Sequence, residues 1–151
     1  MTIRRMDHVG VIVDDLADAV AFFVELGLEL HGETTVGGDW VDRIVGLDGV
    51  QAQIVMLCTP DGHGRVELAE FHSPPSDEGA QPAPANALGI RHIAFVVEDI
   101  EAMVARLRAR GNEPVGELVR YRDSYRLCYV RGPAGIIVEL AEPIDRQAQI
   151  P

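Results

Sequence analysis

The sequence contains no lysine. All 13 basic residues are arginines, and 24 acidic residues outnumber them, which leaves a net charge of −11. Such an acidic surface repels phosphate backbones and argues against nucleic acid as a partner. It does not exclude an anionic substrate, because local arginines or a bound cation can reverse the field inside a pocket.

Cysteines and long apolar runs are also scarce. The only two cysteines, Cys58 and Cys128, lie in apolar, strand-like runs, so we expect free buried thiols instead of a disulfide or a metal pair. No stretch approaches the roughly 18 apolar residues of a membrane helix, and the amino terminus lacks the apolar core of a signal peptide. We therefore expect a cytoplasmic protein with no membrane partner.

An internal repeat organises the chain. The pentapeptide Val-Glu-Leu-Ala-Glu occurs at residues 66–70 and again at 138–142. Residues 8–16 match residues 92–100 at an offset of 84, and Gly27 and Gly111 keep that offset. Two similar modules follow, and 151 residues with 47% apolar content suffice for one compact domain.

Periodicity predicts the same plan in both modules. For the first module we expect a strand over 8–13, a helix from Asp14 or Asp15 to Leu26, and strands over 28–34, 40–47, 51–58 and 65–71. For the second we expect a strand over 90–97, a helix over 100–110, and strands over 117–120, 124–130 and 136–141. The predicted domain is residues 1–143, with module one at 1–72, a proline-rich linker at 73–87, module two at 88–143 and a tail at 144–151.

Two histidines and two glutamates stand at equivalent places in the modules: His8, Glu67, His92 and Glu139. Strand alternation puts each on the face opposite the Val, Leu and Ile residues that should meet the helices. Each alone has a plain alternative, a satisfied strand histidine or a solvent-facing carboxylate. Together they predict one site for a divalent ion such as Zn, Ni, Co, Mn or Fe(II), because the same groups gathered without a cation would carry desolvation and repulsion costs.

Other polar groups suggest substrate contacts. Residues 121–126 combine two arginines, two tyrosines and a serine, which indicates either an anion or headgroup contact or an ordinary polar loop. Trp40 either lines the pocket or packs in the core. The predicted substrate-binding residues are Arg122, Tyr125, Arg126 and Trp40. Surface positions are expected for His31, His63 and His72, and the opposite strand face for Glu70 and Glu142.

Three stretches resemble strand motifs of the vicinal oxygen chelate superfamily, which groups glyoxalases, bleomycin-resistance proteins and dioxygenases. They are residues 8–16, residues 89–95 and residues 132–140, and the resemblance covers roughly residues 6–142. It implies an α+β fold in which two paired βαβββ modules form a cupped, barrel-like mixed sheet with helices outside. It also implies a metal at the positions of His8, Glu67, His92 and Glu139, and a homodimer.

Within that superfamily, the presence of all four ligand positions resembles glyoxalase I and methylmalonyl-CoA epimerase. Bacterial glutathione-dependent glyoxalases carry an arginine where this chain has Ile12, and an asparagine where it has Phe71. The resemblance therefore implies an isomerase or lyase that removes a proton alpha to a metal-bound carbonyl of a small molecule, with an acyl-CoA epimerase as its most specific version. Glu139 is the first choice as catalytic base and Glu67 the second. The alternatives are an Fe(II) extradiol-type dioxygenase and a non-catalytic small-molecule (antibiotic) binding protein.

Overall fold

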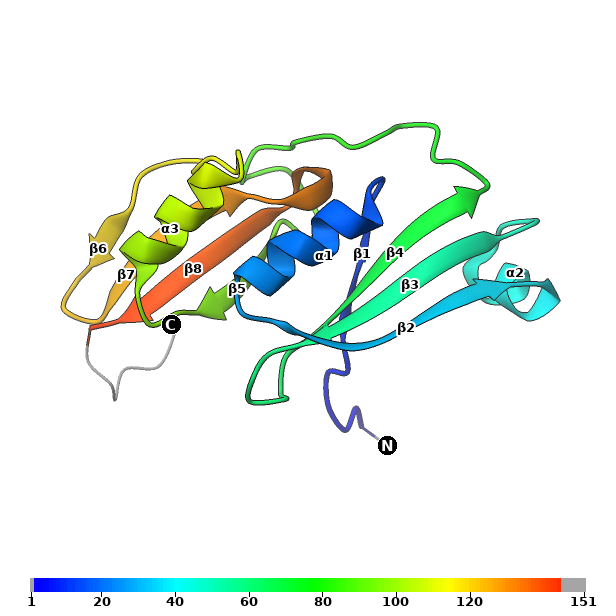
Figure 1. Cartoon of the computed structure of the whole chain (residues 1–151), viewed down its shortest axis with the longest axis horizontal. Helices are drawn as coiled ribbons and strands as arrows, with labels where there is room; N and C mark the ends of the chain where they lie inside the picture. The colour runs from blue at the N-terminus through cyan, green and yellow to red at the C-terminus, as the bar shows by residue number, and fades with distance from the viewer. Residues whose placement is uncertain (1, 145–151) are drawn as a thin grey trace. The chain divides into compact units, whose positions relative to one another are not determined.

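The structure, a computed structural model, describes residues 2–144, and the chain divides into two compact units, Met1–Ala80 and Gln81–Pro151. The first unit holds β1 (Val9–Ile12), α1 (Leu16–Glu25), β2 (Glu29–Gly37), α2 (Asp39–Val45), β3 (Gln51–Cys58) and β4 (Arg65–Ser73) (Figure 1). The second holds β5 (His92–Val96), α3 (Ile100–Ala109), β6 (Val119–Tyr121), β7 (Tyr125–Arg131), the short 3-10 turn Pro133–Gly135, and β8 (Ile137–Pro143). Of the predicted tail, only Ile144 lies within the described residues.

Each unit contains one four-stranded mixed sheet. The strand orders are β1-β4-β3-β2 and β5-β8-β7-β6. In both, the first strand pairs in parallel with the last and the other pairs are antiparallel. The predicted α+β fold with two βαβββ modules is thus confirmed, and the sequence repeat corresponds to a repeat of topology.

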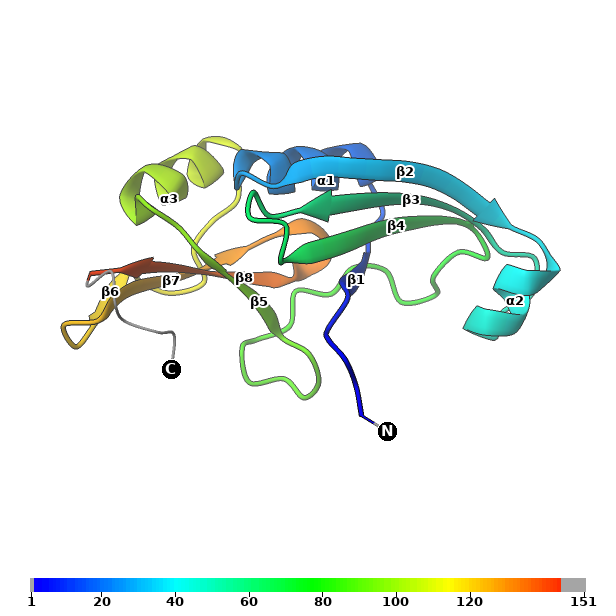
Figure 2. The same cartoon turned by 90° about the horizontal axis from the view of Figure 1, so that it is seen from below.

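The helices begin alike in both units. Asp15 caps α1 by accepting a hydrogen bond from the Asp18 amide, and Asp99 caps α3 by accepting one from the Ala102 amide. Both helices pack on one face of their own sheet through apolar side chains (Figure 2). In α1 the buried residues are Leu16, Ala19, Phe22 and Phe23, and in α3 they are Ile100, Met103 and Leu107.

Alternation along the last strand of each unit separates core from candidate site. In β4, Val66 and Leu68 are 3% and 0% exposed, whereas Glu67 between them points to the other face. Val138 and Leu140 of β8 are both 0% exposed and flank Glu139 in the same way. Each such buried aliphatic side chain contributes roughly 1.5–3 kcal/mol to folding, so the strand register that presents the glutamates is strongly fixed.

The predicted strand over residues 40–47 is wrong, because this segment forms helix α2. Its apolar residues Trp40, Val41, Ile44 and Val45 recur at helical spacing. Glycines bound the segment on both sides: Gly38 (φ 99°) precedes it and Gly46 (φ 72°) ends it in the left-handed conformation. The Asp42 carboxylate accepts hydrogen bonds from the amides of Gly49 and Val50 and so ties the helix to the loop before β3. Only one face of the helix is buried, where Val41 packs beside Val50 and Ala52.

Both cysteines are free, as predicted; Cys128 is buried and Cys58 is half-buried. Burial raises the pKa of the Cys128 thiol. Within the described part of the chain, no helix is long and apolar enough to cross a membrane.

Candidate metal centre

The first unit brings His8 and Glu67 together. His8 directly precedes β1, Glu67 lies in the neighbouring β4, and the two side chains approach to 3.6 Å between Nε2 and Oε2. Gly10 stands opposite Glu67 in the parallel register, and no atom lies within 4 Å of where its Cβ would be. Both side chains are accessible, 37% and 28% exposed, so the pair faces open space above a small residue.

The other edge of the His8 ring contacts Asp7. The Nδ1 atom lies 2.8 Å from the Asp7 Oδ2 atom, so in the neutral ring a proton on Nδ1 leaves the lone pair on Nε2, the atom nearer Glu67. Arg5 and Arg65 also contact the Asp7 carboxylate, at 2.9 and 3.4 Å. The hydrogen bond with His8, followed by the charges of the two arginines, lowers the pKa of Asp7.

The second unit repeats the pair with His92 and Glu139. Their Nε2 and Oε2 atoms are 3.2 Å apart, and the side chains are 41% and 14% exposed. Ala94 stands opposite Glu139 in the parallel register, where Gly10 stands in the first unit. The residue before His92 is Arg91, so this histidine lacks an adjacent aspartate like Asp7.

Tyr129 joins the second pair and is a residue that the sequence analysis missed. It lies opposite Glu139 in the antiparallel register of β7 and β8, and its ring centroid is 5.2 Å from that of His92. Burial and, second, the negative charge of Glu139 raise the pKa of the Tyr129 phenol, so its hydroxyl keeps its proton at neutral pH and can donate a hydrogen bond. Only the β7–β8 register, which depends on the turn between them, identifies this residue.

The donor types and separations suit a divalent cation. Two nitrogen or oxygen ligands, each roughly 2.0–2.2 Å from one metal ion, lie about 3.0–3.5 Å from each other. The measured separations of 3.6 and 3.2 Å are close to this range. Among residues 2–144 no group of three or more His, Cys, Asp or Glu side chains forms a metal-binding cluster. The structure therefore brings the four predicted ligands together as two pairs, one in each unit, and their union around a single ion stays a prediction.

The predicted substrate residues fall in different places. Tyr125 lies on the same strand face as Tyr129, is 1% exposed, and has a hydroxyl with no hydrogen-bond partner in the described residues. Arg126 points to the other face, where it binds Glu142 and Glu101 of α3. The structure thus does not bring Arg126 to the side of Glu139.

Arg122 and Trp40 are accessible. Arg122 adopts a positive φ of 52°, and its guanidinium lies 5.3 Å from the centre of the Tyr121 ring. Trp40 is 59% exposed on α2, which contradicts the alternative that it packs in the core. His31, His63 and His72 are exposed, as expected.

Two exposed apolar side chains share the strand faces of the predicted ligands. Ile12 of β1 is 54% exposed and Val96 of β5 is 58% exposed, and they occupy equivalent positions of the repeat. Exposed aliphatic groups beside polar ligands are a feature of small-molecule sites.

A family profile described as the Glyoxalase/Bleomycin resistance protein/Dioxygenase superfamily matches residues 5–140. The chain belongs to this superfamily. Members of the superfamily typically use a divalent metal ion, in agreement with the donor set above.

Individual relatives agree with this membership. The crystal structure of a glyoxalase family protein from Bacillus cereus is 47% identical, covers 96% of this chain and 97% of its own, and superposes with a TM-score of 0.92. The protein YaeR of Escherichia coli strain K12 is 29% identical over 93% of this chain and 97% of its own length. The fosfomycin resistance protein FosX of Listeria monocytogenes shares the fold, with 20% identity, 92% and 93% coverage and a TM-score of 0.59.

Proposed function

We propose that this superfamily member is a divalent-metal-dependent isomerase or lyase of the glyoxalase and epimerase type. It removes a proton from the carbon next to a carbonyl or thioester of a small-molecule substrate. The observation that carries the proposal is the repeated pair of a histidine and a glutamate, His8 with Glu67 and His92 with Glu139, on equivalent strands of two modules.

His8, Glu67, His92 and Glu139 are the residues that would hold the metal. When bound, a divalent ion supplies Lewis acidity that stabilises the negative charge developing on the substrate oxygen. The chain contributes orientation: the Asp7 contact fixes which nitrogen of His8 is free, and histidine ligands in metal sites commonly have such a carboxylate partner.

The proposed base is Glu139, with Glu67 as the second choice. A carboxylate can take the proton from the carbon and return it to the same or the neighbouring carbon, so that the reaction is an isomerisation without loss of atoms. Glu139 is the less exposed of the two, at 14% against 28%, so its carboxylate is better shielded from bulk water. The Tyr129 hydroxyl, beside Glu139, would donate a hydrogen bond to the substrate oxygen.

Local residues bear on the substrate class. Ile12 stands where bacterial glutathione-dependent glyoxalases carry an arginine, and its exposed side chain offers an apolar contact instead of a cation. We therefore propose an acyl thioester, such as an acyl-CoA, in preference to a glutathione adduct. The exposed Arg122 is the proposed contact for a polar headgroup; the Tyr125 hydroxyl is buried and is not accessible to such a group.

We further propose that the protein works in the cytoplasm as a homodimer. The two histidine–glutamate pairs lie in separate units, so a complete set of ligands could come from one chain or from two. Light scattering coupled to gel filtration measures the subunit number.

The first experiment measures metal and turnover separately. Protein purified without chelator or nickel resin is expected to contain close to one divalent ion per complete site by elemental analysis, and a His8→Ala/Glu139→Ala variant is expected to lose it. Glu139→Gln is expected to remove proton exchange at the alpha carbon of a methylmalonyl-CoA-type thioester in deuterated water, with the fold retained by circular dichroism.

Other outcomes point elsewhere. Absence of metal after reconstitution contradicts the shared site and favours a metal-independent binding protein. Oxygen consumption with a catechol, and none of the expected exchange, favours a dioxygenase. Unchanged exchange in Glu139→Gln contradicts the assignment of Glu139 as base.

A further inference from the structure

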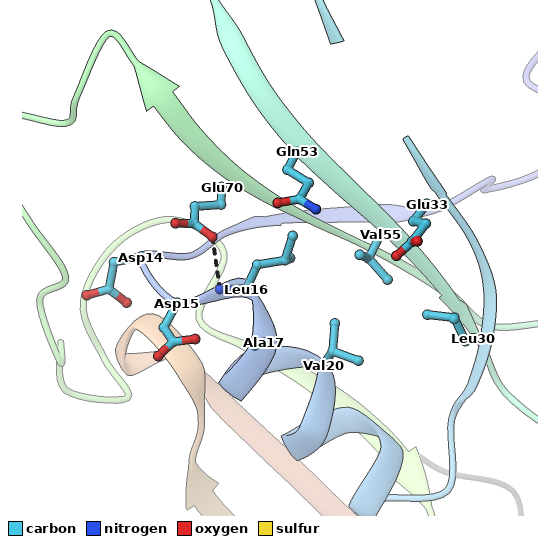
Figure 3. A pocket seen from close by; sticks show the side chains of 10 residues that line it. All are labelled: Asp14, Asp15, Leu16, Ala17, Val20, Leu30, Glu33, Gln53, Val55 and Glu70. Carbon is cyan, nitrogen blue, oxygen red and sulfur yellow. Dashed lines mark hydrogen bonds between the residues drawn. The ribbon is translucent and has the colours of Figure 1, made fainter. Parts of the chain in front are cut away.

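The first unit has a groove on the helix side of its sheet, the face opposite Glu67. It measures about 690 Å³ and lies between the start of α1 and strands β2, β3 and β4 (Figure 3). Its lining combines apolar and acidic side chains. The apolar ones are Leu16, Ala17, Val20, Leu30 and Val55, the acidic ones are Asp14, Asp15, Glu33 and Glu70, and Gln53 completes the set.

Glu70 is the acidic residue with the best-defined role. Its Oε2 atom accepts a hydrogen bond from the Leu16 amide at the start of α1, 3.2 Å away (Figure 3). Across the strand pair, Gln53 stands opposite Glu70. Within residues 2–144, no ion pair joins Glu70, Asp14 or Glu33 to an arginine.

In the second unit, the position equivalent to Glu70 is occupied by a carboxylate that binds a guanidinium. The counterpart of Glu70 in the repeated pentapeptide is Glu142, and Arg126 stands opposite it as Gln53 stands opposite Glu70. The Arg126 guanidinium bridges Glu142, at 3.1 Å, and Glu101 in the first turn of α3, at 2.5 Å. Thus in one module a guanidinium sits between the last strand and the helix, held by two carboxylates.

In the first module, the residues equivalent to Arg126 and Glu101 are different. Gln53 replaces the arginine, and Ala17 occupies the α1 position equivalent to Glu101. The carboxylate on the strand is kept as Glu70, and further acidic groups come from Asp14 and Glu33. The first module therefore has no guanidinium of its own at this position. It has an open groove with an apolar wall, in which Leu30 is 57% exposed.

We propose that this groove binds a small alkylguanidinium ligand, whose cation lies against Glu70 and whose alkyl chain lies on Leu30, Val20 and Val55. Carboxylates hold a guanidinium through charge-assisted, often paired hydrogen bonds. The volume lies in the range of small-molecule pockets, roughly 300–1,000 Å³. The groove uses none of the proposed metal ligands, so the inference stands independently of the proposed function.

The test is a titration of the full chain with n-butylguanidinium, followed by amide chemical shifts. Saturable shifts are expected at Leu16, whose amide binds Glu70, and at Gln53. The neutral isostere n-butylurea should give no saturable shift. Gln53→Arg places the chain's own guanidinium in the groove, as Arg126 does in the second unit, and is expected to weaken binding at least about tenfold.

A matched control adds the same charge elsewhere. Asn86 is exposed and lies outside the groove, so Asn86→Arg should bind n-butylguanidinium like the unaltered protein. Three results overturn the proposal: no saturable shift up to about 10 mM ligand, an equal response to n-butylurea, or unchanged affinity in Gln53→Arg. The guanidinium could belong to a free small molecule or to an arginine side chain of another protein. A blocked tripeptide with a central arginine separates these two sources, because tighter binding of the tripeptide than of n-butylguanidinium would overturn the proposal of a free small ligand.

Discussion

The carboxylate of Asp7 lies 2.8 Å from Nδ1 of His8, on the opposite edge of the imidazole ring from Glu67. The contact holds the ring so that Nε2, the proposed ligand atom, faces the glutamate. The second unit has no equivalent, because Arg91 occupies the position before His92. The two halves of the proposed metal site are therefore supported differently.

Removal of the Asp7 carboxylate should weaken metal binding. Asp7→Ala frees the His8 ring and its tautomer, and loss of such a supporting carboxylate typically lowers metal affinity about 10–100-fold. Competition with a chromogenic chelator measures the affinity. Arg5→Ala is the control, because it removes only an outer partner of Asp7 and should leave the affinity within about threefold. Equal affinities of Asp7→Ala and the unaltered protein would contradict the supporting role of Asp7.

Tyr129→Phe should separate catalysis from metal binding. The change removes the hydroxyl but keeps the ring beside His92. Metal content should stay constant, while kcat of the proposed reaction falls about 10- to 100-fold through loss of a hydrogen bond to the developing oxyanion. Tyr121→Phe, at an exposed position of β6, should leave kcat unchanged. A fall in metal content instead of kcat would show that Tyr129 supports the ligands.

Asp42→Ala should destabilise the first unit. It removes two hydrogen bonds, 2.9 Å from the Gly49 amide and 2.8 Å from the Val50 amide. The expected loss is about 1–3 kcal/mol in free energy of unfolding, measured by urea denaturation. Asp39→Ala alters the same helix at an exposed first-turn position and should cost less. An equal loss of unfolding free energy in Asp42→Ala and Asp39→Ala would show that the effect comes from removing a negative charge from the helix, and not from the two hydrogen bonds.

The charge of Asp61 should make a pH-dependent contribution to the thermal stability of the fold. Its pKa is lowered below the ordinary value of 3.8, first by the Thr59 hydroxyl and then by the His63 amide. A lowered pKa means that the ionised form stabilises the fold above the unfolded pKa, and that this contribution disappears as pH falls through the folded pKa. Asp61→Asn should therefore lower the thermal midpoint at pH 7, and the difference should shrink towards pH 3. A difference that is constant with pH would exclude the charge of Asp61 as its cause.

Local patterns in the sequence were sufficient for most of the fold. The predicted strand over 51–58 coincides with β3, and the predicted helix starts, after Asp14 or Asp15 and at Ile100, agree with α1 and α3. The failure came at residues 40–47, where Val41, Ile44 and Val45 recur at helical spacing and not at every second position. The glycines on either side and the Asp42 contacts, which join residues seven and eight positions apart, decided for the helix.

The sequence by itself determined the two-module plan, the superfamily and the facing of His8, Glu67, His92 and Glu139, because repeat spacing and strand alternation are local properties of a chain. Pairing between strands decided the rest. Only the β7–β8 register puts Tyr129 beside Glu139 and turns Arg126 towards Glu101 of α3, away from the predicted site. Such contacts join residues far apart in sequence, and the packing that selects one register has no signature in either segment alone.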